Sequence, residues 1–567
     1  MALITNLYSA LAQGTLWGIM ALGVYITFRI LDIADLSCDG TFALGGCISA
    51  ILITRGVNPF VTLLFALVGG MLAGLVTGWL HTKLMIPAIL AGILTMIALW
   101  SVNIRVMGGP NVSLLGEDTA FTKVMDLLGV DQTLATLVVG VIIGAIVIAA
   151  LYWFFGTEIG CALRATGNNE FMVRALGGNT DTSKVLGLVI SNGLISVSGA
   201  LVAQNQGYGD IKMGTGSIVI GLASIVIGEV IFGKRFNFAY ILASLIGGAM
   251  VYRMIISLVL HFGLSTDDMK LFTAIIVALA LGILLSNQNI HIAGHQHRKR
   301  GKVMLEIKNV HKTFNKGTIN EKKALNGVNL HLDPGDFVTI IGGNGAGKST
   351  TLNMVAGVYP IDQGTIILDG KDISDLPEYK RAYMLGRVFQ DPMMGTAAGM
   401  QIEENMAMAN RRGKKRGLSW GITKKEKEMF KEKLQMLDLG LEDRMTSKVG
   451  LLSGGQRQAL TLLMATLKKP SLLLLDEHTA ALDPKTAKKV LDITEKIVAR
   501  DNLTTMMVTH NMKDAINIGN RLIMMSDGKI IYDVKGEEKK KLKVADLLQK
   551  FEEASGGEFA NDRMLLS

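Results

Sequence analysis

The sequence predicts a polytopic α-helical membrane domain of about nine spans, followed by an α/β P-loop domain, in one chain of 567 residues. Two observations predict this division. Apolar runs long enough to cross a bilayer recur as far as residue 290. Beyond residue 302 the chain becomes charged, and the apolar run "VTII" leads into the glycine-rich "GGNGAGKST". This pattern is typical of a phosphate-binding loop between a strand and a helix.

The apolar half is expected to cross the membrane repeatedly. We place spans near residues 7–28, 38–54, 60–81, 86–104, 133–155, 183–204, 214–233, 238–260 and 269–287. The second span is short, so a re-entrant or broken segment is the alternative to a full crossing. The distribution of Lys and Arg favours an outside N-terminus and a cytoplasmic side for residue 291 onward, although Arg55 and Arg105 then lie outside.

Charge is distributed unevenly along the chain, whose formal net charge is +9. Residues 1–290 contain 13 Lys and Arg against 14 Asp and Glu, so the excess lies in the second half. A basic soluble half is typical of nucleic-acid binding, but beside an apolar half we expect contact with anionic lipid headgroups and no nucleic acid. The linker "HRKRGK" is predicted to anchor the last span at the cytoplasmic surface.

Four polar side chains fall within or beside predicted spans, namely Asp35, Asp39, Asn192 and Glu229. Such groups are costly in lipid and normally face a bundle interior or an aqueous pathway. A position of the three carboxylates at headgroup level is an equally good interpretation, because span boundaries read from sequence can be displaced by several residues.

The phosphate-binding loop follows the P-loop pattern without a departure. Its glycines allow backbone N–H groups to curl around phosphates at a helix N-terminus. Lys348 is placed for the β- and γ-phosphates, and Ser349 for Mg²⁺. We expect nucleotide binding by Gly342, Gly343, Asn344, Gly345, Ala346, Gly347, Lys348, Ser349 and Thr350.

Further motifs follow in a fixed order. The buried strand "SLLLLDE" delivers Asp476 to the metal and Glu477 to the attacking water, and His510 ends the strand "TTMMVTH". Gln390 follows "GRVF", Asp483 lies in "AALDP", and "LLSGGQRQAL" is a glycine-rich turn that opens a helix.

Together these motifs resemble the ATPase of ABC transporters over roughly residues 303–535. The resemblance implies ATP and Mg²⁺ as cofactors, with Glu477 as general base, His510 as γ-phosphate sensor, and catalysis assisted by Lys348. Gln390 would contact Mg²⁺, beside Ser349 and Asp476, and Phe314 would stack on adenine. The second nucleotide-contacting set would serve the opposite subunit of a homodimer and comprises Ser453, Gly454, Gly455, Gln456 and Asp483.

One residue departs from this family pattern. His478 follows the two carboxylates where relatives usually carry proline. A His can titrate near neutral pH, but we interpret it as a loop substitution. The basic run "RRGKKRG", residues 411–417, is predicted to be a solvated surface loop, and "VADLLQKF" a surface helix.

The loop at residues 156–180 is the longest predicted cytoplasmic loop of the apolar half. Its centre, "EFMVRALGG", has Phe171, Val173 and Leu176 at roughly helical spacing and stops at Gly177-Gly178. It resembles the coupling segment of importer permeases of the branched-chain amino acid and ribose type, and "DLSCDGTFALGG" is similar to another segment of them. Within that group the likeness is greatest to permeases for tryptophan or other aromatic amino acids.

These resemblances imply an ATP-driven importer, in which a fused half-transporter works as a homodimer with an extracellular substrate-binding protein. We expect a multi-pass protein of a bacterial plasma membrane that imports an aromatic or hydrophobic amino acid, with a sugar or nucleoside as the alternative. The predicted domains are 1–290 (permease), 291–302 (linker), 303–535 (ATPase, in the cytoplasm) and 536–567 (tail). An ABC exporter would need six spans and two large intracellular loops, and a membrane-tethered ATPase would need only an anchor.

Overall fold

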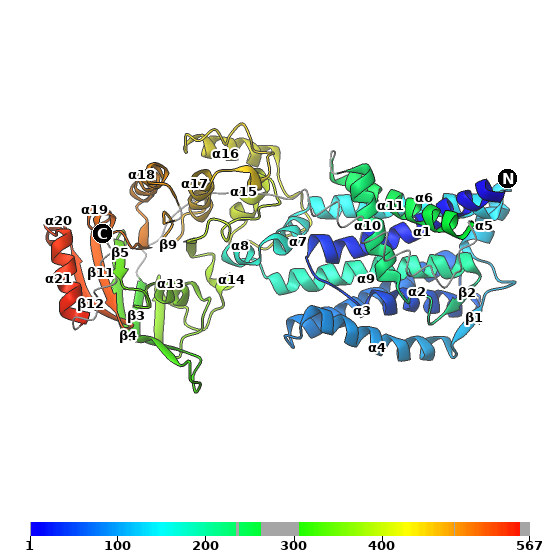
Figure 1. Ribbon diagram of the computed structural model, residues 1–567, viewed down its shortest axis with the longest axis horizontal. Coiled ribbons are helices and arrows are strands. Elements are labelled where there is room, and N and C mark those ends of the chain that lie inside the picture. The colour runs from blue at the N-terminus through cyan, green and yellow to red at the C-terminus, as the bar shows by residue number, and fades with distance from the viewer. Residues whose placement is uncertain (1, 234–236, 262–304, 481, 556–567) are drawn as a thin grey trace. The chain divides into compact units, whose positions relative to one another are not determined.

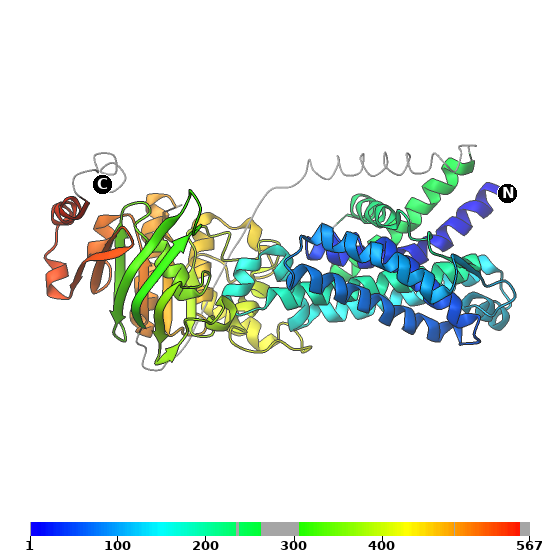
Figure 2. The same cartoon turned by 90° about the horizontal axis from the view of Figure 1, so that it is seen from below.

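The computed structural model describes residues 2–233, 237–261, 305–480 and 482–555. They form two compact units, which Figure 1 and Figure 2 show as a helical bundle and a mixed α/β unit. The helical unit contains the chain up to Asn168 and again from Thr180. The α/β unit contains Asn169–Asn179 together with the chain from Leu305 onward. A short segment from the middle of the apolar half is therefore part of the α/β unit.

The helical unit contains the predicted spans as helices. Its elements are α1 (Ala2–Tyr25), the π-helical η1 (Ile26–Ile30), α2 (Cys38–Ile53), α3 (Pro59–Thr82), α4 (Ala88–Met107), β1 (Asn111–Ser113), α5 (Ala120–Leu128), α6 (Gln132–Gly156), α7 (Glu158–Asn168), α9 (Thr180–Gln206), β2 (Tyr208–Asp210), α10 (Ser217–Phe232) and α11 (Phe238–His261). Strands β1 and β2 pair antiparallel.

Eight of the nine predicted spans coincide with helices. Among the described residues, six helices, with η1 continuing α1, are long and apolar enough to cross a bilayer, whereas α2 and α10 have only 16 residues each. The predicted ninth span, 269–287, lies outside the described residues, so the count of nine stays a prediction. The short α2 fits the alternative in which the second span does not fully cross the bilayer. Helix α10 is equally short, although the sequence predicted a full crossing at residues 214–233.

Small residues bring α2 and α9 into close contact. A Cβ added at Gly45 would overlap the backbone of Ser196, and one added at Gly199 would overlap the backbone of Phe42. Small residues at helix contacts allow such approach in lipid, where no hydrophobic force draws helices together. Helix α9 is the most enclosed long helix after α1, with 72% of its apolar window buried.

Three of the four singled-out polar residues, Asp35, Asn192 and Glu229, are buried inside the helical unit, and Asp39 is half-buried. Asn192 Nδ2 donates to Asp35 Oδ2 at 2.8 Å, and Ser37 Oγ donates to Asn192 Oδ1 at 3.1 Å. Arg29 pairs with Glu229 at 2.7 Å, and the Glu229 side chain is 2% exposed. Asp35, Asn192 and Glu229 therefore face the interior of the bundle, while the depth of the three carboxylates in the membrane stays a prediction.

The α/β unit is built on two sheets. Its strands are β3 (Leu305–Phe314), β4 (Lys322–Leu332), β5 (Phe337–Gly342), β6 (Gln363–Leu368), β7 (Lys371–Asp372), β8 (Leu385–Val388), β9 (Leu472–Asp476), β10 (Thr504–Val508), β11 (Arg521–Ser526) and β12 (Lys529–Lys535). The order β12-β11-β5-β10-β9-β8 forms a six-stranded sheet that is parallel except for β12, and β4-β3-β6-β7 is antiparallel.

Helices flank and connect these strands. They are α8 (Glu170–Ala175), α13 (Lys348–Ala356), α14 (Glu378–Arg381), α15 (Ile402–Asn410), α16 (Lys424–Gln435), the 3₁₀ turn η3 (Val449–Leu451), α17 (Gly454–Ala465), α18 (Pro484–Asp501), α19 (Met512–Asn517), α20 (Glu537–Lys540) and α21 (Val544–Ser555). Helix α21 contains the predicted surface helix, and its Leu547 and Phe551 are buried in a cluster with Met512 and Ala515 of α19.

The central parallel strands align the site motifs at one sheet edge. Strand β10 lies between β5 and β9, and Val508 is in register with both Ile340 and Asp476. The strands are apolar and fully buried along their middle, as is usual for a parallel sheet covered on both faces. Since ligands of open α/β sheets bind outside the carboxyl ends of the strands, we expect the ligand-binding site at this edge.

The close packing of α2 on α9 can be tested by Gly199→Ala. The new methyl group meets backbone rather than a mobile side chain, so we expect a loss of about 1–3 kcal/mol and a lower thermal unfolding midpoint of the detergent-solubilised protein. The matched control is Gly144→Ala in α6, where the nearest atom is the flexible end of Ile246 at 3.0 Å. Equal midpoints for the two variants would contradict the assignment.

Candidate functional site

The P-loop joins the end of β5 to the first turn of α13. Gly342, Gly345 and Gly347 have φ values of 149°, 80° and 99°, which side chains rarely adopt. A Cβ at Gly347 would also lie 2.7 Å from the carbonyl oxygen of Ala324. The Nζ of Lys348 donates to the carbonyl oxygens of Gly342 and Gly343 at 2.8 and 3.0 Å. The amino group therefore lies inside the loop.

Two oxygen groups meet beside this loop. Ser349 Oγ donates to Asp476 Oδ1 at 3.0 Å, and burial raises the pKa of the Asp476 carboxyl above its usual value. A hydroxyl next to a carboxylate suits Mg²⁺, which binds one or two protein oxygens and completes its shell with water and phosphate. No cluster of three or more His, Cys, Asp or Glu suited to a metal occurs within the described ranges.

Glu477 is held between two other predicted site residues. Its Oε2 accepts from Gln390 Nε2 at 3.0 Å, and its Oε1 lies 2.6 Å from His510 Nε2. Its φ of 43° is in the left-handed region, which costs energy for a residue with a side chain. Strain of this kind clusters at functional sites. Gln390, predicted as a metal ligand, thus contacts Glu477 here.

Phe314, at the end of β3, is close to a second aromatic residue. Its ring centroid is 5.2 Å from that of Tyr359, in an edge-to-face arrangement, and Lys312 Nζ is 5.8 Å from the Phe314 ring. Tyr359 follows the P-loop helix in "GVYP" and was missed by sequence reasoning, because nothing local relates it to a strand 45 residues earlier.

The glycine-rich turn and Asp483 form a second cluster. Ser453 is the N-cap of α17 and exchanges hydrogen bonds with Gln456 in a capping box. Asp483 caps α18 and accepts from Thr486 N at 3.1 Å. A Cβ at Gly455 would overlap Thr486, so this glycine allows α17 and α18 to meet. The structure thus brings the turn and Asp483 together, while their nucleotide contacts stay a prediction.

The predicted coupling segment packs within the α/β unit. Asn169 caps α8, and its Nδ2 donates to the carbonyl oxygens of Met393, Met394 and Thr396 at 2.8, 3.0 and 2.7 Å. Phe171, expected on the same face as Val173, is 53% exposed. The buried face instead contains Met172 and Val173, each 1% exposed, and Leu176.

The loop that accepts these hydrogen bonds begins at Gln390. Three residues later, Met393 Sδ lies 2.9 Å from Arg457 Nη1 of α17. Gly395 faces Thr461 of the same helix so closely that a Cβ would overlap it. The loop therefore contacts the coupling segment, Glu477 through Gln390, and the helix opened by the glycine-rich turn.

The prediction for the basic run 411–417 is wrong for its first residues. Arg411 and Arg412 are 7% and 2% exposed, and Arg412 donates to the carbonyl oxygens of Ala465 and Lys468. Burial lowers the pKa of Arg412 to about 10. Farther along, Arg416 Nη2 donates to the carbonyl oxygen of Leu176 at 3.1 Å. These cations donate to backbone carbonyl oxygens, and Arg416 bonds the coupling segment, which composition could not reveal.

His478 is a buried neutral residue. It is 2% exposed, and burial lowers its pKa from 6.5 to about 4. The Thr494 hydroxyl donates to the carbonyl oxygen of Val490 at 2.8 Å, so its oxygen accepts from His478 Nε2 at 3.0 Å. The proton of the neutral ring is therefore assigned to Nε2. The interpretation of His478 as a structural substitution agrees with this geometry.

His478 should make stability depend on pH. Because the folded pKa is below the unfolded value, the unfolded chain binds the extra proton first. Stability should therefore fall by about 1.4 kcal/mol for each pH unit between 6.5 and 4. We expect His478→Gln to reduce this fall, measured as the urea midpoint by circular dichroism of the solubilised chain at pH 7.5 and 5.5. His331→Gln, at a half-exposed histidine, is the control; identical pH dependence in both variants would contradict the prediction.

Known proteins match both halves of the chain. The family model "Branched-chain amino acid transport system / permease component" matches residues 6–286, and "ABC transporter" matches residues 325–480. The "Tyrosine transport ATP-binding protein" of Clostridioides difficile is 45% identical over 251 residues, which are 44% of this chain and all of the relative. The "Tyrosine transport system permease protein" of the same organism is 38% identical over 288 residues, 51% of this chain and 94% of the relative.

These matches explain the P-loop geometry and the helical unit together. The motifs of the α/β unit are those of an ABC ATPase, which binds ATP and couples its hydrolysis to transport. The helical unit is the membrane part. The chain belongs to the ABC transporter family and carries in one polypeptide a permease of the branched-chain amino acid transport type and its ATPase.

Proposed function

We propose that this protein is an ATP-driven importer of an aromatic or hydrophobic amino acid, with L-tyrosine as the first candidate. The observation that carries the proposal is the match of the two halves to two components of one named system. The ATPase half matches the ATP-binding protein of a tyrosine transporter, and the membrane half matches its permease. A sugar or nucleoside would not account for both matches at once.

The geometry supports a specific division of roles in ATP hydrolysis. We assign Glu477 as the general base, because its carboxylate is oriented by Gln390 on one oxygen and His510 on the other. Lys348 lies where the P-loop would receive the β- and γ-phosphates. Ser349 and Asp476 would hold Mg²⁺, which would neutralise charge that develops on the phosphates.

The second cluster supports a homodimer. Ser453 and Asp483 both cap helices that meet through Gly455, so the turn and Asp483 present one preformed surface. We propose that this surface covers the nucleotide bound to a second copy of the chain. One polypeptide carries one P-loop and one such turn, so two copies would provide two complete sites.

The coupling segment supports a route from ATP to the membrane part. Asn169 Nδ2 bonds three carbonyl oxygens of the loop that starts at Gln390, and Gln390 bonds Glu477. A shift of this loop on nucleotide binding would therefore move α8, whose chain continues into α7 and α9 of the helical unit. We propose that this motion alternates access to the pathway.

The membrane part and its surroundings complete the proposal. We place the protein in a bacterial plasma membrane with the ATPase in the cytoplasm. The proposed domains are the permease at 1–290, the linker at 291–302, the ATPase at 303–535 and the tail at 536–567. The substrate would arrive on an extracellular binding protein, a partner suited to import. The basic linker 291–302 would lie among anionic headgroups.

The proposal is tested by uptake into proteoliposomes. The full chain is reconstituted with ATP and Mg²⁺ on the ATPase side, and a tyrosine-binding protein with radiolabelled L-tyrosine on the other. We expect ATP-dependent uptake, and in Glu477→Gln a loss of ATP hydrolysis of about 10²-fold or more with ATP binding retained, because the base is gone while the P-loop is intact. Wild-type hydrolysis in this variant would overturn the catalytic assignment, and absence of tyrosine uptake by the wild type would overturn the substrate.

The route through α8 predicts an uncoupled variant. Asn169→Asp replaces the amide donor with a carboxylate that faces three carbonyl oxygens, so we expect the segment to detach from the loop. Basal ATP hydrolysis should stay within about twofold of wild type, while uptake per ATP should fall at least about tenfold.

The control for this variant lies on the same short helix. Phe171→Ala changes a side chain that is 53% exposed and leaves the Asn169 hydrogen bonds in place, so coupling should be retained. If Asn169→Asp transports as well as Phe171→Ala, the route through this segment is wrong.

A further inference from the structure

We propose that a cavity of the helical unit, between α2, α4 and the segment before α10, binds a ligand that has an ammonium group beside an aromatic or apolar body. The inference rests on the proposed function and deepens it, since it places a substrate-recognition site in the membrane part. The cavity has a volume of about 470 Å³. That volume is in the range of about 300–1,000 Å³ that small-molecule sites occupy.

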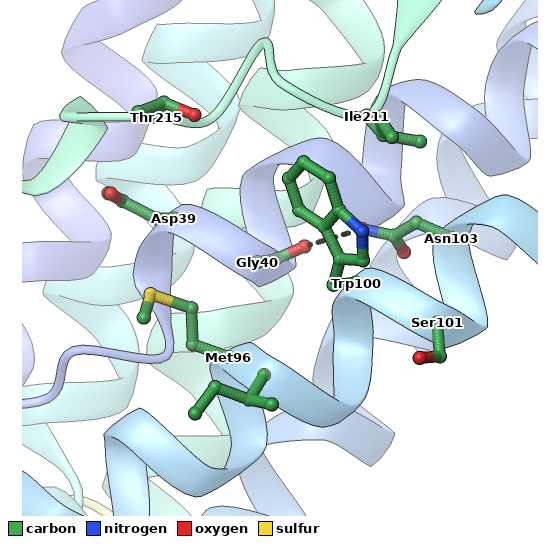
Figure 3. Close-up of a pocket in the computed structure, with 9 residues that line it drawn as sticks. Asp39, Gly40, Met96, Trp100, Ser101, Asn103, Ile211 and Thr215 are labelled. Carbon is green, nitrogen blue, oxygen red and sulfur yellow. Dashed lines mark hydrogen bonds between the residues drawn. The ribbon is translucent and has the colours of Figure 1, made fainter. Parts of the chain in front are cut away.

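The cavity has an apolar wall with a large ring. Figure 3 shows Trp100 of α4 with its indole ring toward Gly40 and Ile211, and Met96 one turn earlier on the same helix. Trp100 is 44% exposed and lines the cavity. An indole face attracts both aromatic rings and cations.

One polar group in the wall has an unused acceptor. Asn103 is 1% exposed, and its Nδ2 donates to the carbonyl oxygen of Gly40 at 3.2 Å (Figure 3). The carbonyl oxygen of Gly40 can only accept a hydrogen bond. The Nδ2 amino group of Asn103 must therefore face it, and Oδ1 points elsewhere. This Oδ1 is buried and has no hydrogen-bond partner among the described residues. A buried acceptor left unpaired costs about 1–3 kcal/mol, and a ligand that donates would remove this cost.

A carboxylate adds negative charge to the same cavity. Asp39 Oδ2 accepts from Gly216 N at 2.8 Å, and Oδ1 accepts from Ser217 Oγ at 2.9 Å and Ile218 N at 3.0 Å. Two backbone N–H groups at the start of α10, those of Gly216 and Ile218, are therefore already bonded to a carboxylate. With Asp39 charged and Asn103 Oδ1 an acceptor, the cavity favours a cationic donor over a carboxylate.

The position of the cavity in the fold supports a transport role. Asp39 is in the first turn of α2 and caps α10, so it joins the only two apolar helices of 10–17 residues that the described chain contains. In transporters, short or interrupted helices with exposed ends commonly surround the substrate site, because their free backbone groups are tolerated only where they line a cavity.

Binding to the full chain in lipid nanodiscs tests the inference with three probes. They are L-tyrosine, phenethylamine, which has no carboxylate, and 3-(4-hydroxyphenyl)propionate, which has no ammonium group. We expect the first two to bind, and the third to bind at least about tenfold more weakly because it meets two acceptors. Titration calorimetry or equilibrium dialysis gives the dissociation constants.

Trp100→Ala should weaken phenethylamine binding by about tenfold, because the ring contact is lost. The matched control is Trp79→Ala on α3, where the ring is 52% exposed and does not line the cavity. Basal ATP hydrolysis should be unchanged in the control Trp79→Ala, since this side chain lies on the helical unit and outside the cavity. A third variant, Asn103→Leu, removes the unpaired acceptor and should also weaken phenethylamine binding.

The outcomes separate this inference from the proposed substrate. If phenethylamine binds and Trp100→Ala weakens it while tyrosine uptake fails, the cavity is correct and the substrate is wrong. If uptake succeeds but Trp100→Ala and Trp79→Ala bind phenethylamine equally, the cavity is wrong. Binding of the propionate as tightly as phenethylamine, or no binding of any probe, also overturns the inference.

Discussion

The side-chain amide of Asn169 is the contact on which the mechanical interpretation of this protein depends. Its two N–H groups are shared among three carbonyl oxygens of one loop, at Met393, Met394 and Thr396. Because backbone carbonyls cannot rotate away as surface side chains do, the contact ties the start of α8 to the loop backbone. Arg416 adds a second hold at the other end of the segment. For this reason eleven residues from the apolar half belong to the ATPase unit.

The same loop also contacts the residues around the P-loop site. It begins at Gln390, which bonds Glu477, and its Met393 and Gly395 pack on α17, the helix opened by the glycine-rich turn. Glu477, the glycine-rich turn and residues 169–179 therefore all contact this one loop. A displacement of that loop would shift all three of these contacts, since each contact involves backbone or a buried side chain. The left-handed backbone of Glu477 indicates that its orientation is imposed by these surroundings.

The helical unit combines tight packing with local polarity. Where α2 crosses α9, glycines replace side chains and the backbones meet, so this contact is firm. The start of α2 is different, because the side chain of Asp39, in the first turn of α2, accepts hydrogen bonds from the first residues of α10. Hydrogen bonds to a charged group are strong, and the half-buried Asp39 carboxylate accepts three of them. Asp39 thus links the ends of two helices beside the cavity, and the buried Asn103 Oδ1 has no hydrogen-bond partner among the described residues.

The sequence by itself determined four features encoded in contiguous stretches: the P-loop, the strand that ends in Asp476-Glu477, the glycine-rich turn that opens a helix at Ser453, and eight apolar helices. Each depends on local backbone geometry, on side chains a few residues apart, or on an apolar period. Only the tertiary structure decided which loop Asn169 would bond, 224 residues or more away, and that Arg412 would be buried. A run of charged residues is normally exposed to solvent. Arg412 is buried because the packing of the unit places backbone carbonyl oxygens where its guanidinium group can donate to them. Long-range contacts arise from the packing of whole elements, which no local pattern specifies.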